Sequence, residues 1–314
     1  MPPKILVISG PTASGKTRLA VELALRHGGE VVSADSMQVY RRMDIGTAKP
    51  TPEEMRGIPH HMLDVADPEE DFSVARYVEL AAPCVDDILA RGKLPIVAGG
   101  TGLYLDSLLS GRTFAPFSPD GGLRARLEAR FDALGGEAML GELAAADPEA
   151  AARLHPNDRK RIVRALEVFQ QTGKTISQHN RETRALPLRY DALTLSLAFQ
   201  RREDMWARID RRVDEMMAAG LAEEVRALLD SGVPARCTAM QAIGYKEMAA
   251  ARRGGGDVCA AAEEIKLRSR QYAKRQLTWL RRNEDIHWIY WEKERDFAAA
   301  LRIATEILSA QGLQ

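Results

Sequence analysis

The feature that most constrains this chain is a glycine-rich loop at residues 10–17, which reads G-P-T-A-S-G-K-T. An apolar run at residues 4–9 precedes the loop and a helical pattern at residues 18–25 follows it, which is the order strand, loop, helix. Glycines let the backbone curl until successive N–H groups face phosphate oxygens, and the helix N-terminus adds partial positive charge. We therefore expect phosphate to bind at Gly10, Pro11, Thr12, Ala13, Ser14, Gly15, Lys16 and Thr17.

Two side chains of this loop carry particular chemistry. Lys16 supplies a point charge, and the Thr17 hydroxyl is suited to a Mg²⁺ ion that bridges phosphate oxygens. The loop alone does not say whether the phosphate belongs to a nucleotide.

Composition narrows the class of protein. The 314 residues are 45% hydrophobic and 28% charged, with a formal net charge of +0, so an affinity for a polyanion must come from local patches. The three cysteines, Cys84, Cys237 and Cys259, form no C-x-x-C pair, which argues against a zinc site or a disulfide framework. No apolar stretch has the length of a membrane span and no leader precedes the first strand, so we expect a cytoplasmic protein.

Two further turns are expected beside the loop, because the carboxyl ends of parallel strands share one edge of a sheet. A short strand at residues 30–33 leads to Asp35, which is either a general base or metal ligand, or a turn-capping aspartate. A strand at residues 94–98 leads to the G-G-T-G turn that holds Thr101. That turn either holds a second anionic group or a leaving oxygen, or serves only to pack a helix.

Residues 41–50 have no apolar period and predict an exposed loop near the site. His60 and His61 fall on a short strand predicted over residues 60–65, where they point to opposite faces, so a structural role is favoured.

The domain organisation follows from a change of pattern near residue 111. Strands and helices alternate before it, whereas residues 123–134, 137–146, 148–154 and 158–171 are helical patterns, and a strand at residues 190–199 resumes the sheet. We predict an α/β core of residues 1–111 and 190–314, with a parallel sheet flanked by helices, and an all-helical insertion of residues 112–189.

Two cationic stretches allow contact with phosphates. Lys160, Arg161 and Arg164 share helical spacings in the insertion, although a solvated helix face is the ordinary explanation of such a run. Residues 263–282 contain seven Lys and Arg side chains without an acid after Glu264, which favours a helix that faces a diphosphate or a nucleic-acid backbone over a solvated one.

Taken together, these blocks closely resemble the tRNA dimethylallyltransferases, the isopentenyltransferase family that acts on adenosine beside the anticodon, in its bacterial form. The matching blocks lie in order at residues 10–17, 35–40, 43–50, 99–104, 155–158, 164–168, 244–245 and 274–279. The phosphate loop alone is widespread, but the block D-I-G-T-A-K-P at residues 44–50 together with the others is specific.

The resemblance implies a P-loop NTPase-like fold whose loop binds dimethylallyl diphosphate rather than a nucleoside triphosphate, with Mg²⁺ and with Arg212 as a further diphosphate ligand. It implies transfer of the dimethylallyl group to N6 of adenosine in the anticodon stem-loop, with Asp35 as proton acceptor and Thr101 at the leaving oxygen. It also implies tRNA contacts from Asp35, Ser36, Met37, Gln38, Thr101, Arg124, Lys160, Arg161, Ile162, Val163, Arg164, Gln241, Ala242, Ile243, Gly244, Tyr245 and Lys246.

Two other functions remain open from the residues alone. A kinase with the same loop would bind ATP and a phosphoryl acceptor, and a nucleotide-switched RNA-binding module would need no base aimed at an amine. No long apolar or heptad surface is present, so we expect a monomer.

Overall fold

The computed structural model describes residues 2–111, 114 and 122–313. The chain forms two compact units, one made of residues 1–109 and 189–314 and the other of residues 110–188. None of the helices in the described ranges combines the length and the apolar character of a membrane span.

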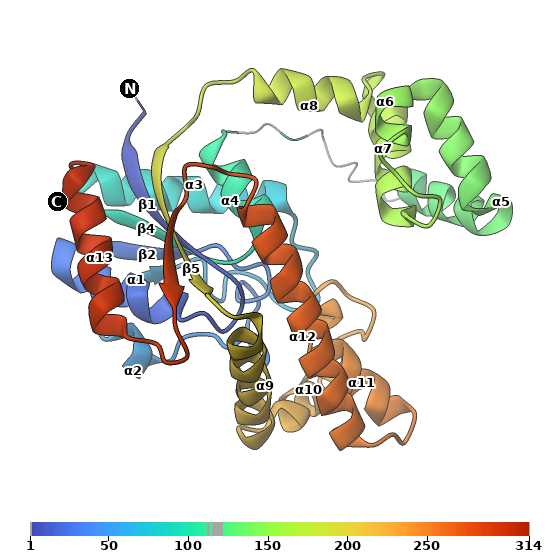
Figure 1. The fold of residues 1–314 in the computed structure, drawn as a ribbon. Helices are drawn as coiled ribbons and strands as arrows, with labels where there is room; N and C mark the ends of the chain where they lie inside the picture. Colours follow the sequence, from blue (N-terminus) through green and yellow to red (C-terminus); the bar gives the residue numbers. More distant parts are fainter. Residues whose placement is uncertain (1, 112–113, 115–121, 314) are drawn as a thin grey trace. The chain divides into compact units, whose positions relative to one another are not determined.

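The first unit is an α/β fold built on a six-stranded sheet in the order β3-β2-β4-β1-β5-β6, in which all neighbouring strands are parallel (Figure 1). The strands are β1 (Lys4–Ser9), β2 (Glu30–Ser33), β3 (His60–His61), β4 (Pro95–Ala98), β5 (Asp191–Phe199) and β6 (His287–Trp291). The predicted parallel sheet is therefore confirmed, and only the strand expected over residues 60–65 is much shorter than predicted.

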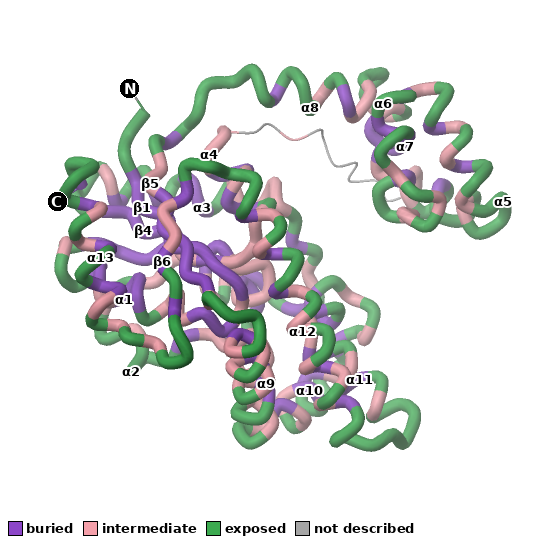
Figure 2. The backbone as a smooth tube through the Cα atoms, viewed as in Figure 1, coloured by how far each residue is buried: buried purple, intermediate pink, exposed green. Residues whose placement is uncertain are grey.

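Helices cover both faces of this sheet. On one face, α1 (Lys16–His27) and α13 (Phe297–Ala310) pack their apolar sides against the strands. The other face is covered by α3 (Val74–Ala90), against which α4 (Gly102–Leu109) packs, and the apolar cluster of this face continues into α10 (Leu221–Asp230), α11 (Tyr245–Arg253) and α12 (Val258–Leu280), which lie beyond the sheet. The remaining helices of this unit are α2 (Pro52–Met55), α9 (Arg202–Ala218) and the 3₁₀ turn η1 (Ala239–Gln241). Figure 2 shows the central strands as the most continuously buried part of the chain.

Residues 41–50 are not the freely exposed loop that the sequence predicts. Met43 is fully buried, and the Glu224 carboxylate on α10 accepts hydrogen bonds from the backbone N–H groups of Asp44, Ile45 and Gly46 at 2.8, 2.9 and 3.2 Å. The Tyr245 hydroxyl donates to the same carboxylate at 2.5 Å. The loop itself was predicted correctly, but its exposure was overestimated, because the partner of these N–H groups lies about 180 residues away in the sequence.

The described residues of the second unit form helices joined by turns and contain no strand. It contains α5 (Gly122–Ala146), which is kinked at Gly135, and the shorter helices α6 (Pro148–Ala151), α7 (Arg159–Thr172) and α8 (Ile176–Arg184). A core of its own includes Leu127, Met139, Leu143 and Leu166. The sequence analysis missed α8 because its polar residues hide the apolar period, although a capping box between Thr175 and Gln178 marks its start.

We expect a Glu224→Ala variant to unfold more easily, because three backbone N–H groups and the Tyr245 hydroxyl lose a charged acceptor. The free energy of unfolding should fall by about 2 kcal/mol or more, as is typical of hydrogen bonds to a charged group, when measured by urea denaturation. The matched control is Glu223→Ala on the neighbouring exposed residue of the same helix. Equal losses in the two variants would contradict this role of Glu224.

Candidate active site

The phosphate loop lies between β1 and α1 and needs glycine at two of its positions. Gly10 has a φ of 141°, and a Cβ atom there would lie 2.5 Å from the Leu197 carbonyl oxygen. Gly15 has a φ of 92°, and its Cβ would lie 2.7 Å from the Phe297 ring. Both glycines have a backbone conformation with positive φ and lie close to a neighbouring group. A side chain at either position would therefore change the conformation of the loop.

Two polar side chains of this loop lack a counter-ion or partner within the described ranges. The Lys16 ammonium donates to the Pro11 carbonyl at 2.8 Å and forms no ion pair there. Burial, and next the charge of Arg212, lowers the pKa of Lys16 to about 7, although Asp35 acts in the opposite direction. The Ser14 hydroxyl is buried without a hydrogen-bond partner. A bound anion would satisfy both groups.

Asp35 follows β2 and has two separate functions available to its two oxygens. Its Oδ1 accepts hydrogen bonds from the backbone N–H groups of Met37 at 2.8 Å and Gln38 at 3.4 Å, so the turn-capping interpretation is confirmed. The carboxylate also lines the cavity beside the phosphate loop. Asp35 therefore caps the turn with Oδ1. Its Oδ2 has no hydrogen bond to the described residues and is available to a molecule bound in the cavity.

Thr101 lies at the end of β4, in the turn that the sequence predicts beside Asp35. Its Oγ1 accepts a hydrogen bond from the Ser36 N–H at 3.2 Å, and its own N–H donates to the Ala34 carbonyl at 3.3 Å. Thr101 itself is not among the lining residues of either cavity described below, whereas Gly99 of the same turn lines the larger one. The structure therefore brings Thr101 next to the Asp35 turn rather than into the phosphate pocket.

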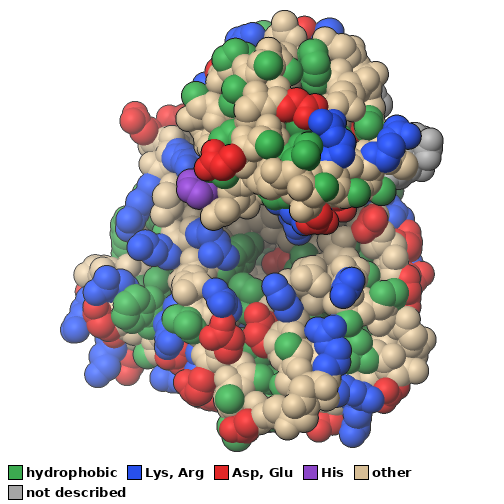
Figure 3. All heavy atoms as spheres, turned by 90° about the vertical axis from the view of Figure 1, so that its right-hand side faces the viewer, with side chains coloured by type: hydrophobic (Ala, Val, Ile, Leu, Met, Phe, Trp, Pro, Cys, Tyr) green, Lys and Arg blue, Asp and Glu red, His purple; other side chains and the backbone are tan. Residues whose placement is uncertain are grey.

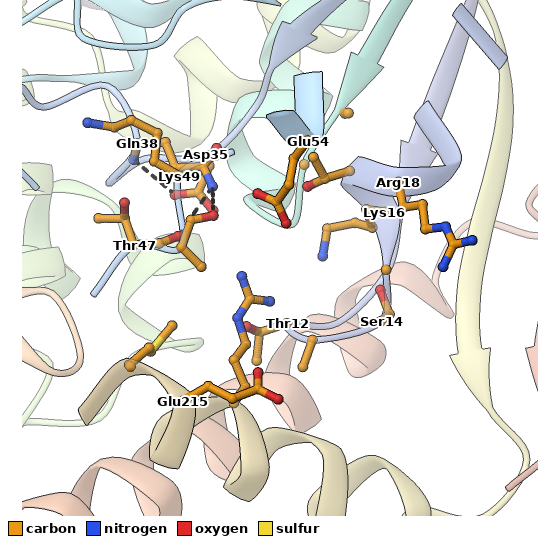
Figure 4. Close-up of a pocket in the computed structure, with 18 of the residues that line it drawn as sticks. Thr12, Ser14, Lys16, Arg18, Asp35, Gln38, Thr47, Lys49, Glu54 and Glu215 are labelled. Atoms are coloured by element: carbon orange, nitrogen blue, oxygen red, sulfur yellow. Dashed lines mark hydrogen bonds between the residues drawn. The ribbon is translucent and has the colours of Figure 1, made fainter. Parts of the chain in front are cut away.

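Two neighbouring cavities meet at this edge of the sheet. The larger, about 550 Å³, is lined by the phosphate loop, residues from Asp44 to Glu54, and Arg212 and Arg295. Figure 4 shows Lys16 and Asp35 on different sides of this pocket. The smaller cavity, about 290 Å³, has the apolar side chains Met37, Ile209, Val213, Met216, Ile243 and Ile265 in its wall. The residues common to both cavities are Thr12, Ala13, Asp35, Thr47, Arg212, Met216 and Tyr272.

Arginines gather at the larger cavity. Burial, and next the charge of Arg208, lowers the pKa of Arg212, and burial together with Arg208, Arg18 and Arg212 lowers that of Arg295. Neither Arg212 nor Arg295 forms an ion pair with a carboxylate in the described part of the chain. The Phe297 ring lies 4.1 Å from the Arg18 guanidinium and 5.4 Å from that of Arg295. So many neighbouring cations favour a multiply charged anion.

Sequence reasoning found Arg212 but missed Arg295, Tyr272 and Gln276. Arg295 follows the last strand, outside every recognised block, and only the fold brings it to the loop. Tyr272 and Gln276 lie on α12, where the sequence analysis considered only the cationic side chains. Gln276 nevertheless falls inside the matching block at residues 274–279.

Comparison with known proteins agrees with this arrangement. A family model described as IPP transferase matches residues 38–283, and one described as isopentenyl transferase matches residues 3–70. A tRNA dimethylallyltransferase of Acetivibrio thermocellus is 47% identical over 91% of this chain and 91% of its own. A tRNA dimethylallyltransferase 1 of Trichlorobacter lovleyi is 50% identical over 92% of this chain and 94% of its own.

The chain belongs to the tRNA dimethylallyltransferase family.

Solved structures agree with the fold. The tRNA isopentenylpyrophosphate transferase of Bacillus halodurans has a TM-score of 0.72 and 40% identity, and the alignment covers 98% of both chains. A eukaryotic dimethylallyltransferase described as acting on tRNA has a TM-score of 0.82 and 31% identity, over 98% of this chain and 80% of its own. The predicted family and fold class are thereby confirmed.

The residues that the resemblance assigns to tRNA in the first unit differ in accessibility. Gln241 and Lys246 are exposed, whereas Ala242 and Tyr245 are buried. The Tyr245 hydroxyl is used by Glu224, and its ring lies against Gly46. The Tyr245 side chain therefore supports residues 41–50, and contact of this residue with RNA stays a prediction. Gln38 also acts locally, since its amide donates to the Thr47 and Ala48 carbonyls at 3.2 and 3.1 Å.

The assigned residues of the second unit divide in the same way. The side chains of Ile162 and Val163 lie in the core of this unit, and contact of these residues with RNA stays a prediction. Arg124 and Arg164 both pair with the buried carboxylate of Glu167, at 2.8 and 2.7 Å. The remaining members, Lys160 and Arg161, are exposed on α7. The expected basic stripe is therefore smaller than the sequence suggests.

The cationic helix α12 is partly neutralised by its neighbours. Lys266 pairs with Asp214 at 2.7 Å, and Arg270 pairs with Asp210 at 2.6 Å, both acids being on α9. Figure 3 shows acidic and basic side chains interspersed over the face that includes these helices. The one-sided charge of this stretch in the sequence therefore overstates its positive potential.

The lowered pKa of Lys16 predicts proton uptake when an anion binds. Below pH 7 the ammonium is already charged, whereas above pH 7 it must take up a proton, so its contribution to affinity falls as the pH rises through 7. At pH 8 we expect the binding of inorganic diphosphate to be accompanied by proton uptake at this site, up to about one proton per protein molecule. Calorimetry in buffers of different ionisation enthalpy measures this number.

The matched control is Lys16→Arg, which stays charged over the same pH range and should lack this proton uptake. Equal uptake by the wild-type protein and the variant would show that Lys16 is already charged in the free site and would contradict this interpretation.

Proposed function

We propose that this chain transfers a dimethylallyl group from dimethylallyl diphosphate to N6 of the adenosine beside the anticodon of tRNA and releases diphosphate. The observation that carries the proposal is that a cation-rich phosphate cavity and a more apolar cavity meet at Asp35 and Arg212. The names of the relatives support the same reaction.

The donor side of the reaction needs positive charge. When the allylic C–O bond breaks, its electron pair leaves with the diphosphate, and positive charge develops on the carbon. Lys16, Arg212 and the amides of the phosphate loop would stabilise the departing diphosphate. The apolar side chains of the smaller cavity, among them Ile209 and Met216, would surround the hydrocarbon and keep water from the developing cation.

The acceptor side needs a base. As the N6–C bond forms, the nitrogen acquires positive charge and must lose a proton. Because Asp35 lines both cavities and keeps one oxygen unbonded, its carboxylate would accept that proton. The Thr101 hydroxyl accepts from the Ser36 N–H and keeps its own hydrogen to donate, but Thr101 lines neither cavity, so we rank it below Asp35 in this reaction.

A Mg²⁺ ion fits this site as a companion of the diphosphate. Within the described residues no cluster of three or more His, Cys, Asp or Glu side chains is able to hold a metal, so most ligands would come from phosphate oxygens and water, as Mg²⁺ prefers. The Thr17 hydroxyl, at the start of α1, is the protein ligand that we propose. When bound, the ion adds positive charge to the leaving group.

The tRNA would present its adenosine after the base leaves its stack in the anticodon stem-loop. We propose that the exposed Lys160 and Arg161 on the second unit, and Gln241 and Lys246 on the first, contact the RNA. A tRNA substrate would place the protein in the cytoplasm, and the monomeric state stays a prediction.

An Asp35→Asn variant separates the two functions of this carboxylate. An asparagine oxygen still caps the turn by accepting from Met37, but it does not accept a proton from the amine. We expect the rate of dimethylallyl transfer to tRNA to fall by about 10²- to 10⁴-fold, while binding of tRNA and of inorganic diphosphate stays unchanged. Single-turnover transfer of labelled donor measures the rate.

The matched variant is Ser36→Ala on the adjacent residue, which keeps the carboxylate and should retain most of the activity. Full activity of Asp35→Asn would exclude Asp35 as the base, and a loss of diphosphate binding would indicate that the turn itself had collapsed.

A double variant, Lys160→Glu with Arg161→Glu, tests the RNA surface of the second unit. We expect tRNA binding to weaken and the salt dependence of binding to become shallower, by about one unit of slope for each lost phosphate contact. Inorganic diphosphate should bind as before. The measurement is a filter-binding titration at several salt concentrations.

The charge-matched control is Arg26→Glu with Arg302→Glu. Arg26 on α1 and Arg302 on α13 lie close together on another part of the first unit. If this control weakened tRNA binding as much as the first double variant, the effect would be one of net charge and not of a surface on α7.

A further inference from the structure

Gln276 occupies a slot between the two glycine-rich turns of the site. It lies on α12 with 7% of its surface exposed. Its Oε1 accepts a hydrogen bond from the Thr12 backbone N–H at 2.9 Å, and its Nε2 donates to the Gly100 carbonyl at 2.9 Å. Within the described ranges it is the only side chain that forms hydrogen bonds to both turns. One amide group therefore links the phosphate loop to the turn that carries Thr101.

The slot accepts little other than this amide. A Cβ atom at Gly100 would lie 2.2 Å from Nε2 of Gln276, so glycine at that position is what lets the amide approach. Trp279, one turn further along α12, packs in the same way on Gly102, where a Cβ would lie 2.3 Å from the indole. Because Thr12 offers a donor and Gly100 an acceptor, only a side chain with one group of each kind and this length satisfies both.

The link has a consequence for the phosphate loop. The Thr12 N–H is bonded to Gln276 and the Ser14 N–H donates to the Pro11 carbonyl at 3.3 Å, so the amides left to face an anion are the others that follow Thr12 in the loop. The same bond fixes the distance between the loop and the Gly99–Gly102 turn, whose Thr101 is bonded in turn to Ser36 beside Asp35. A shift at either end would move the bound diphosphate relative to the proton acceptor.

We propose that Gln276 is a positioning residue that sets the distance between the diphosphate of the donor and the Asp35 side of the site. The proposal rests on the proposed transfer reaction. Gln276 lines the larger cavity, but its Oε1 and Nε2 are bonded to the backbone of Thr12 and Gly100, and it acts through those two turns. Loss of the link lowers the rate of transfer because reacting groups tolerate little displacement, while the other amides of the loop still bind diphosphate.

The first test is Gln276→Met, which keeps length and volume and removes both hydrogen bonds. We expect kcat for dimethylallyl transfer to fall by about 10- to 100-fold, as a displacement of about 1 Å does, with the Kd of inorganic diphosphate within about threefold of wild type. Exchange of the Thr12 amide hydrogen, followed by NMR on protein labelled with ¹⁵N-threonine, should accelerate at least about tenfold as that bond is lost.

The second test is Gln276→Glu, which turns the link into a pH-dependent one. The ionised carboxylate accepts from Thr12 but repels the Gly100 carbonyl, whereas the protonated acid reproduces both bonds. Relative to wild type, kcat of this variant should be low at pH 8 and recover as the pH falls towards about 5.5, since burial raises a carboxyl pKa above its usual value of about 4.3. A residue that merely filled space would give no such recovery.

The matched control is Gln271→Glu, the same substitution at an exposed position of α12. It should leave kcat, the pH profile and Thr12 exchange as in wild type. The proposal is overturned if Gln276→Met transfers at the wild-type rate, if diphosphate binding falls in proportion to kcat, or if Thr12 exchange is unchanged. The exchange measurement needs no activity, so failure of the link is distinguishable from failure of the proposed reaction, in which wild-type protein itself transfers nothing.

Discussion

Unbalanced positive charge around the phosphate loop is the constraint on which the rest of the site depends. Lys16 and Arg212 have no carboxylate within ion-pairing distance in the described part of the chain, and burial lowers the pKa of both. Buried cations are costly unless an opposite charge arrives. The site is therefore in its most favourable state with an anion bound, and the energy of that interaction is available to hold a departing diphosphate.

The parallel sheet explains how distant residues come to this anion. β4 lies between β1 and β2, and the three parallel strands have their carboxyl ends at the same edge of the sheet. The phosphate loop, the Asp35 turn and the Thr101 turn therefore lie close together there. Helix α12 then lies over this edge and ties two of the turns together through Gln276. The turns at the strand ends thus form one side of both cavities, and side chains of α9 and α12 supply much of the apolar wall of the smaller one.

Local patterns predicted the strands, the phosphate loop and the position of Asp35, because spacing and turn chemistry act over a few residues. They did not predict pairings between distant side chains. The sequence did not indicate the ion pair between Arg164 and the buried Glu167. It also did not indicate that Glu224 accepts hydrogen bonds from backbone N–H groups of residues 41–50. Arg295 carried no local signal at all. Such contacts form only in the folded chain, and the pattern of neighbouring residues in the sequence does not predict them.

The most direct test of the account is the mass of a tRNA after incubation with the protein. An unmodified tRNA with adenosine beside its anticodon would be treated with Mg²⁺ and dimethylallyl diphosphate, and in parallel with Mg²⁺ and ATP. The account predicts a gain of one dimethylallyl group on that adenosine in the first reaction and no phosphoryl transfer in the second. No gain in mass, together with phosphoryl transfer from ATP, would contradict it.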